Sequence, residues 1–273
     1  MTIRDIGVAM VRLGAESLRD HMLGDPILTP RHGFSAVRRG GLWCFTSTKL
    51  DAGVFNHVSG YGTFADASQR AIDLILRHYA SVGRSAAVEV LMPAVSRSAR
   101  ALLERNGFRD DGVIFQCHIR TMTRSPRAHE IAGFTVARVP KGDARRYSKL
   151  ATEGFGGPGA IALVFERGWI RQIQRSRRVA AFMGRVNDTP AATGVLYRGR
   201  DLAGLYSGSV LKRYRGRGIQ NAMIAARVAH GWQLGLRTFY SWSDPDSSSA
   251  RNLRDEGFRT RFEVHSFSRK TDA

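Results

Sequence analysis

The sequence predicts an α/β protein that is built from two similar halves in tandem. An apolar, strand-like run at 202–210 leads into a turn rich in glycine and arginine, and a helical pattern of apolar residues follows over 219–230. The closing segment of the chain occurs a second time near its middle. The length of 273 residues, with 43% hydrophobic residues, is sufficient for two domains with ordinary cores.

The two halves share their ending at a constant spacing. Each ending follows a helix and a strand, at 67–80 and 87–92 in the first half and at 219–230 and 238–242 in the second. A strand-like run comes after each, at 113–119 and 262–267. The shared residues are Ser98, Leu103, Gly107, Phe108 and Arg109, which recur as Ser248, Leu253, Gly257, Phe258 and Arg259. This pattern indicates a duplication at the scale of a domain. The polar stretch 123–129 is the expected seam, so the predicted domains are 1–125 and 130–273.

The turn of the second half is the most informative stretch, Arg213-Tyr214-Arg215-Gly216-Arg217-Gly218. A strand, such a turn and a helix form a cradle for anions, because the first N–H groups of the helix point outward and its dipole favours negative charge. The two glycines let a phosphate approach the backbone without a Cβ in the way. The turn is therefore predicted to hold a phosphate or pyrophosphate group.

This hexapeptide resembles motif A of the GNAT acyltransferases, Arg/Gln-x-x-Gly-x-Gly/Ala, with Arg213, Gly216 and Gly218 on its fixed positions. The order of the elements after it, with a short helix closed by Gly257-Phe258 before a last strand at 259–267, also resembles the GNAT C-terminal half. The resemblance spans essentially the whole chain. It implies two tandem GNAT-like domains, each with a mixed, mostly antiparallel sheet flanked by helices.

The first half carries a changed version of the loop, Phe55 to Thr63. Gly60 and Gly62 remain, but no arginine stands at the leading position of the motif. The pattern Asn56-His57-Val58-x-Gly60-x-Gly62 looks like the N-terminal half of a group of tandem GNAT proteins in bacteria. The resemblance implies a degenerate N-terminal domain that binds no acyl-CoA of its own.

For the second half, the resemblance implies an N-acyltransferase that uses acetyl-CoA or another acyl-CoA, with a small-molecule amine as acceptor and no metal. The backbone of Val210 and Leu211 is expected to contact the pantetheine arm. Asn252 is expected either to bond the cofactor or to be an ordinary exposed helix residue. The loop residues expected to bind the donor are Arg213, Arg215, Gly216, Arg217, Gly218 and Ile219.

The catalytic residues are harder to assign. In the GNAT family a tyrosine on the helix before Gly-Phe often protonates the departing thiolate, but Leu253 occupies that position here, as Leu103 does in the first half. The substitutes are Tyr240, Asp244, Asp246 and Ser209. Helix capping is the alternative role for the Asp and Ser cluster that ends at Ser249. Strand alternation predicts that Ser207 and Ser209 share one face and that Tyr206 lies on the other.

The acceptor site in a GNAT fold is built from the first two helices, expected here at 143–155 and 160–175. The connection 154–159 contains four glycines, which suits a mobile loop near the acceptor, although it also suits a plain helix–helix connection. Glu153, Phe155 and Tyr206 are expected to contact the substrate.

The charge of the chain raises a rival hypothesis. The formal net charge is +19, and residues 126–273 hold 26 Lys and Arg against 12 Asp and Glu. Arg167, Arg171 and Arg175 form one stripe of a helix, which Arg178 extends. The stripe is either a solvated face or a contact for phosphates of tRNA. An aminoacyltransferase that takes its donor from aminoacyl-tRNA, as Fem-type enzymes do, is therefore the alternative. A non-catalytic binder of acyl-CoA or nucleic acid is the second alternative.

The remaining features favour a cytoplasmic protein without a membrane partner. No run of about 18 apolar residues occurs, and the first 20 residues lack the apolar block of a signal peptide. Cys44 and Cys117 lie in strand-like segments and are expected to be buried free thiols, with no metal-ligand spacing around them.

Overall fold

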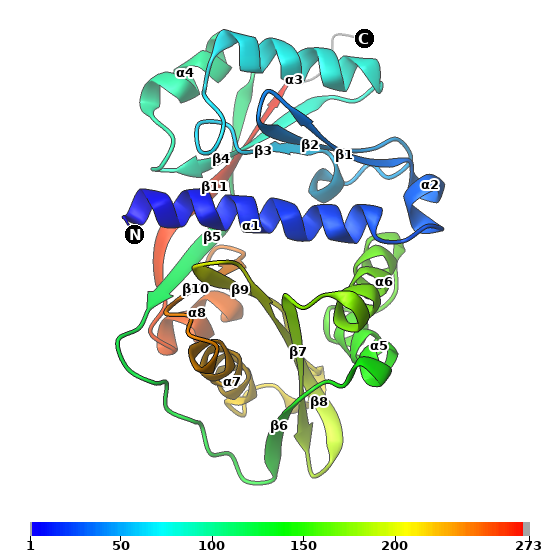
Figure 1. Ribbon diagram of the computed structural model, residues 1–273, viewed down its shortest axis with the longest axis vertical. Helices are drawn as coiled ribbons and strands as arrows, with labels where there is room; N and C mark the ends of the chain where they lie inside the picture. The colour runs from blue at the N-terminus through cyan, green and yellow to red at the C-terminus, as the bar shows by residue number, and fades with distance from the viewer. Residues whose placement is uncertain (1, 270–273) are drawn as a thin grey trace. The chain divides into compact units, whose positions relative to one another are not determined.

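The computed structural model describes residues 2–269 and has a mixed sheet flanked by helices (Figure 1). The predicted α/β class is confirmed. The chain forms two compact units, of which the first comprises the chain up to Cys117 together with the chain from Arg261, and the second comprises His118–Thr260.

In the first unit, β1, β2 and β3 are antiparallel neighbours, and β3 lies parallel to β4. Helix α3 begins after Ser68, whose side chain accepts the N–H of Ala71, and it packs its apolar face on β2 and β4. The elements are α1 (Ile3–Leu23), α2 (Leu28–His32), β1 (Phe34–Arg39), β2 (Leu42–Ser47), η1 (Gly53–Phe55), β3 (His57–Ser59), α3 (Gln69–Ser81), β4 (Ala86–Met92), α4 (Arg97–Arg105) and the start of β5 (Arg109–Thr121).

In the second unit, β6 to β9 are antiparallel neighbours in chain order, and β10 lies parallel to β9. Helix α7 packs on β8 and β9. The elements are β6 (Phe134–Arg138), η2 (Lys141–Asp143), α5 (Ala144–Gly154), α6 (Ala160–Arg175), β7 (Val179–Val186), β8 (Thr189–Arg198), β9 (Leu202–Val210), η3 (Lys212–Tyr214), α7 (Ile219–Gln233), β10 (Thr238–Ser243) and α8 (Ser248–Asp255).

The last strand of each half joins the sheet of the other half. From Glu263 to Arg269, β11 (Arg259–Arg269) pairs antiparallel with β4 of the first unit. From His118 on, β5 belongs to the second unit, where the N–H of Met122 donates to the carbonyl of Arg237. The predicted boundaries, 1–125 and 130–273, describe the duplicated sequence and stay a prediction. The compact units have other limits, because they follow this exchange of strands.

The repeated residues occupy equivalent places in two separate cores. Leu103 and Phe108 lie in the core of the first unit, and Leu253 and Phe258 lie in the core of the second, all of them buried. Leu253 is 2% exposed and Leu103 is 0% exposed. The position at which the resemblance implies a catalytic tyrosine is therefore a packing position in both halves of this chain.

Both cysteines are buried free thiols, as expected. Burial raises the pKa of the Cys44 thiol to about 12. No helix between residues 2 and 269 combines the length and the apolar character that crossing a bilayer takes.

Candidate functional site

The site begins where β9 and β10 separate. The parallel ladder joins Leu202, Ala203 and Gly204 to residues 238–240, and it ends at the pair Gly204–Tyr240. At the next position a side-chain hydrogen bond takes the place of the backbone ladder. The Ser241 hydroxyl donates to the carbonyl of Leu205 at 2.9 Å. Strand β9 continues to Val210, so its last residues leave β10 and present an edge at this opening.

A bulge interrupts β9 at the same place. Ser209 lies opposite Thr193 and Tyr206 lies opposite Val195, so β9 holds one residue more than β8 between these two pairs. Ser207 has a φ of +49°. The extra residue brings Tyr206 and Ser209 to the same face of the sheet. The expectation that they lie on opposite faces is wrong, because it assumed an unbroken alternation.

The loop that is predicted to hold a phosphate is open at its glycines. Gly216 and Gly218 have φ values of +78° and +72°, which favour glycine. A Cβ on Gly216 would meet no atom within 4 Å, and one on Gly218 would touch Ile131 at 3.7 Å. Gly218 is the N-cap residue of α7. Because glycine has no side chain, no capping group satisfies the first N–H groups of the helix. The loop therefore offers helix N–H groups at a surface that an anion can reach.

Four cations surround these glycines, and each of them is exposed: Lys212, Arg213, Arg215 and Arg217. Arg215 donates to the carbonyls of Val210 at 2.9 Å and of Gly154 at 3.2 Å, so it connects the loop to the end of α5. Arg213 lies 3.7 Å from the carboxylate of Glu153. The structure thus brings Glu153, an expected substrate residue, next to the expected donor loop.

The other expected donor and acceptor contacts differ in how available they are. Phe155 is 63% exposed at the end of α5. Ile219 is buried, so its side chain is not available to a donor at the surface. Both backbone groups of Leu211 already have partners, Ala191 for its N–H and Tyr214 for its carbonyl. A pantetheine arm could still donate to the second lone pair of the Leu211 carbonyl, whereas the N–H of Leu211 is already used.

A group of aromatic side chains lines the face that carries Tyr206. The hydroxyls of Tyr206 and Tyr240 form a hydrogen bond, and the Tyr240 ring meets the Trp242 ring edge-on at 5.8 Å. The hydroxyls of Ser209 and Thr193 form a hydrogen bond of 2.8 Å. The structure therefore places three predicted residues, Tyr206, Ser209 and Tyr240, on strands beside the opening.

The Asp and Ser cluster lies beyond the end of β10. Asp244 and Asp246 are exposed, and Asp246 has a φ of +54°. Ser247 caps α8, because its hydroxyl oxygen accepts the N–H of Ala250 at 3.2 Å, so the capping role is confirmed for Ser247. Asn252 is half-buried in α8.

Arg227 was not among the residues predicted from the sequence. This arginine of α7 is buried beneath β8 and β9, and it donates to the carbonyls of Met223 at 2.9 Å and Tyr206 at 3.3 Å. Burial lowers its pKa to about 10. The signal was present in the sequence, because Arg227 continues the stripe of Ile219 and Met223 at four-residue spacing, where an apolar residue is expected.

The loop of the first unit is closed by its own side chains. A Cβ on Gly60 would lie 2.2 Å from the Phe64 ring, and one on Gly62 would lie 2.8 Å from Val95. Within the loop, Gly62 donates its N–H to Ala65, and Ala65 donates to Gly60. A cavity of about 550 Å³ lies beside the loop, lined by residues that include Arg4, Asp66, Pro93, Arg261 and Phe262.

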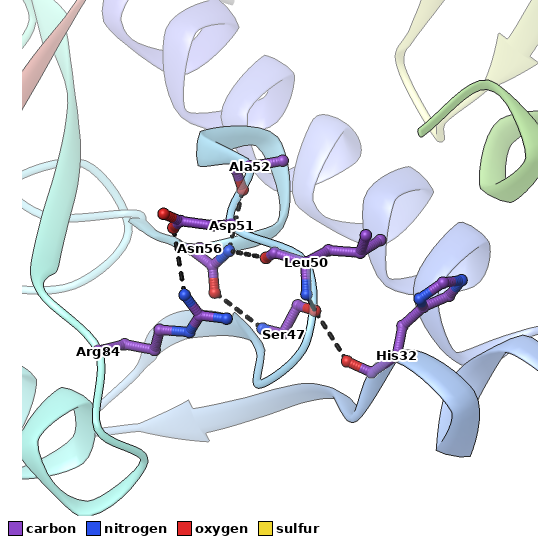
Figure 2. A network of polar contacts seen from close by, with 7 residues as sticks. All are labelled: His32, Ser47, Leu50, Asp51, Ala52, Asn56 and Arg84. Carbon is purple, nitrogen blue, oxygen red and sulfur yellow. Dashed lines mark hydrogen bonds and ion pairs between the residues drawn. The ribbon is translucent and has the colours of Figure 1, made fainter. Parts of the chain in front are cut away.

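Asn56 of the first half organises the connection between β2 and β3 (Figure 2). Asn56 accepts the N–H of Ser47 at 2.8 Å and donates to the carbonyls of Leu50 and Ala52. The Ser47 hydroxyl in turn donates to the carbonyl of His32, and Arg84 pairs with Asp51 beside it. These contacts give Asn56 a structural role, in holding the segment between β2 and β3.

The basic stripe on α6 is presented unevenly. Arg175 is exposed, whereas Arg167 and Arg171 are half-buried. Arg178 donates to the carbonyl of Arg198 at 2.9 Å, and its guanidinium lies 4.8 Å from the centre of the Tyr197 ring. Contact of this stripe with tRNA stays a prediction.

Comparison with known proteins identifies the fold. No protein-family model matches the chain, and no curated protein matches it significantly in sequence. Among solved structures, a GCN5-related N-acetyltransferase from Kribbella flavida is 14% identical, with a TM-score of 0.65 over 96% of this chain and 95% of that one. Another from Sphaerobacter thermophilus is 16% identical, with a TM-score of 0.60 over 98% and 93%. A tandem GNAT protein from the clavulanic acid biosynthesis pathway is 11% identical, with a TM-score of 0.57 over 73% and 69%. The chain has the GNAT fold in its tandem form.

Proposed function

We propose that the protein is an acyltransferase that transfers an acyl group, most simply acetyl, from acyl-CoA to an amine. The observation that carries this proposal is the open loop at Gly216 and Gly218, which joins helix N–H groups to exposed arginines at the start of α7. Structures with the same fold that are named N-acetyltransferases support it. The closed loop at Gly60 and Gly62 favours a single donor site, in the second unit.

The geometry suggests how the reaction proceeds. With the pyrophosphate at the loop, the edge of β9 guides the pantetheine arm toward the opening between β9 and β10. Glu153 and Phe155 at the end of α5 and Tyr206 on β9 receive the amine. The amine nitrogen attacks the thioester carbon, the C–S bond breaks and the amine releases a proton to water. The departing thiolate takes a proton from an acid, which regains one from water. We assign the proton donor to Tyr240, whose hydroxyl is bonded to that of Tyr206.

The proposal is tested by mixing the protein with acetyl-CoA and a panel of primary amines while the released CoA thiol is measured. We expect release that depends on an amine, with little background from the protein because Cys44 and Cys117 are buried. Calorimetry should show one acetyl-CoA bound per chain. If acetyl-CoA does not bind and no amine speeds thiol release, the proposed function is wrong.

Replacing Tyr240 with phenylalanine should lower kcat about 100-fold, the order expected for loss of a general acid, and should leave KM for acetyl-CoA nearly unchanged. The matched control is Tyr79→Phe, which removes another buried phenol that donates a hydrogen bond, to the carbonyl of Phe45 at 2.8 Å in the first unit. The control should keep kcat. A Tyr240→Phe variant with full kcat would assign the proton donor elsewhere, for example to Asp244 or Asp246.

The alternative donor, aminoacyl-tRNA, is motivated by the excess positive charge of residues 126–273 and is tested at Arg175. If the donor is acyl-CoA, Arg175→Glu should leave KM for the thioester within about 2-fold, because exposed charges beyond a Debye length of about 8–10 Å are largely screened. If the donor is aminoacyl-tRNA, the change should weaken tRNA binding and reduce its salt slope by about one unit. Transfer from charged tRNA that RNase abolishes would contradict the acyl-CoA assignment.

A further inference from the structure

Arg227 is a buried cation that contacts no carboxylate among the residues that the structure describes. Its side chain is 2% exposed, and its hydrogen bonds go to two backbone carbonyls. The titratable group that interacts with it is a phenol, Tyr147, and burial raises the pKa of that phenol to about 12, so it supplies no counter-charge near neutral pH. A buried charge of this kind is costly, and apolar replacements of buried ionic groups are often neutral or stabilising. A residue that costs stability at its position points to a role in function.

The guanidinium lies directly against the backbone of β8 and β9. A Cβ on Gly194 of β8 would lie 2.8 Å from the guanidinium carbon of Arg227, and one on Gly208 of β9 would lie 3.4 Å from its Nη2. The guanidinium therefore packs directly on the backbone at Gly194, whereas at Gly208 the side-chain amide of Gln220 lies closer, at 2.8 Å. Gly208 belongs to the bulge of β9, the segment that borders the opening between β9 and β10.

The same guanidinium helps to fix the bulge. Arg227 holds the carbonyl of Tyr206, and Thr193 donates its hydroxyl to the carbonyl of Ser207 at 3.2 Å. Two successive carbonyl oxygens are thus bonded within the protein. This lessens the repulsion that they would exert on negative charge near this part of β9.

We propose that Arg227 is a positioning residue for acyl transfer. It fixes the bulge and supplies a positive potential from behind the backbone to the thioester carbonyl. This inference rests on the proposed function. When the amine attacks, the carbonyl π electrons move to the oxygen, and this negative charge returns as the C–S bond breaks and the sulfur departs with its electron pair. A fixed buried charge stabilises such an oxyanion without reorganisation, and a low local dielectric strengthens the effect.

A purely structural role makes different predictions. If Arg227 only ties α7 to β9, then Arg227→Met should lower the melting temperature, and any loss of rate should follow the loss of folded protein. If Arg227 acts through its charge, Arg227→Met should keep or raise the melting temperature and still slow the reaction. The vibrational frequency of the bound donor carbonyl reports this difference directly, because a positive potential near the oxygen polarises the C=O bond.

The experiment compares the full-length wild type with Arg227→Met, Arg227→Lys and the control Arg237→Met. Arg237 also donates to two backbone carbonyls, those of Trp232 and Leu236. Unlike Arg227 it is exposed, and it stacks on Trp232 near the C-terminal end of α7. Four quantities are measured: the melting temperature, the Kd for acetyl-CoA, kcat with an amine, and the carbonyl stretch of bound acetyl-CoA labelled with carbon-13 at the carbonyl.

We expect Arg227→Met to keep its melting temperature and its Kd within about 3-fold, and to lose about 10-fold to 100-fold in kcat, below the loss from deleting a direct oxyanion donor. Its bound carbonyl should absorb at a higher frequency than in the wild type. Arg227→Lys, which keeps the charge, should lie between the two, and Arg237→Met should match the wild type in kcat and frequency.

Two results would overturn the inference. One is an Arg227→Met protein whose loss of kcat is fully accounted for by its loss of folded protein, since Arg227 would then act through folding alone. The other is an unchanged carbonyl frequency in a folded variant that binds acetyl-CoA. Failure of the wild type itself to bind acetyl-CoA would be a separate outcome, because it overturns the proposed function as well.

Discussion

Replacing Gly218 with glutamate is expected to weaken acetyl-CoA binding by about 100-fold or more, because a carboxylate then stands where a phosphate belongs, and like charges in contact cost several kcal/mol. Gly218 is the N-cap of α7, and its nearest neighbour would be Ile131 at 3.7 Å, so the new side chain has room to occupy the loop. Titration calorimetry of the full chain with acetyl-CoA measures the effect.

The backbone strain of this substitution needs its own control. Gly218 has a φ of +72°, so any side chain there costs about 1–2 kcal/mol of stability. Gly235→Glu imposes the same kind of strain, at a φ of +87° and with no atom within 4 Å of its Cβ, in the turn between α7 and β10. This control should lose similar stability and keep full affinity for acetyl-CoA. Equal loss of affinity in both variants would contradict a donor site at Gly218.

A count of binding sites tests the asymmetry between the two halves. The wild type should bind one acetyl-CoA per chain, because Phe64 and Val95 occupy the space beside Gly60 and Gly62. A second acetyl-CoA that still binds in Gly218→Glu would show that the first unit has a donor site despite its closed loop.

Local pattern was sufficient to predict the elements around the donor loop. The strand at 202–210 and the helix at 160–175 have the predicted bounds, and the Arg-Gly turn opens α7 as expected. These predictions succeeded because strand, turn and helix each leave a signal within a few neighbouring residues.

The exchange of last strands left no such signal. Both endings carry the same Gly-Phe-Arg sequence and a similar strand, so their patterns are compatible with either sheet. The pairing of β11 with β4 depends on contacts between residues far apart in the chain. The domain limits drawn from sequence therefore describe the duplication, whereas the compact units reflect long-range packing.

The site shows the same limit at the scale of single residues. Alternation along β9 placed Tyr206 and Ser209 on opposite faces, and one extra residue at the bulge reversed that result. Arg227 stands in an otherwise apolar stripe of α7, and a break of that kind in the local rules is where functional residues concentrate.

Truncating Leu253 to alanine is expected to lower the free energy of unfolding by about 2–5 kcal/mol, the range for a buried leucine that leaves a cavity. Leu253 is 2% exposed in a core that includes Leu236, Phe239 and Phe258. The matched variant is Leu103→Ala, at the equivalent position of the first core. Urea unfolding should show a comparable loss in both, and the folded fraction of each should keep its kcat, since neither position carries chemistry. A large loss of kcat in Leu253→Ala at full stability would contradict this, and would mean that α8 positions the reacting groups through Leu253 rather than merely packing against the core.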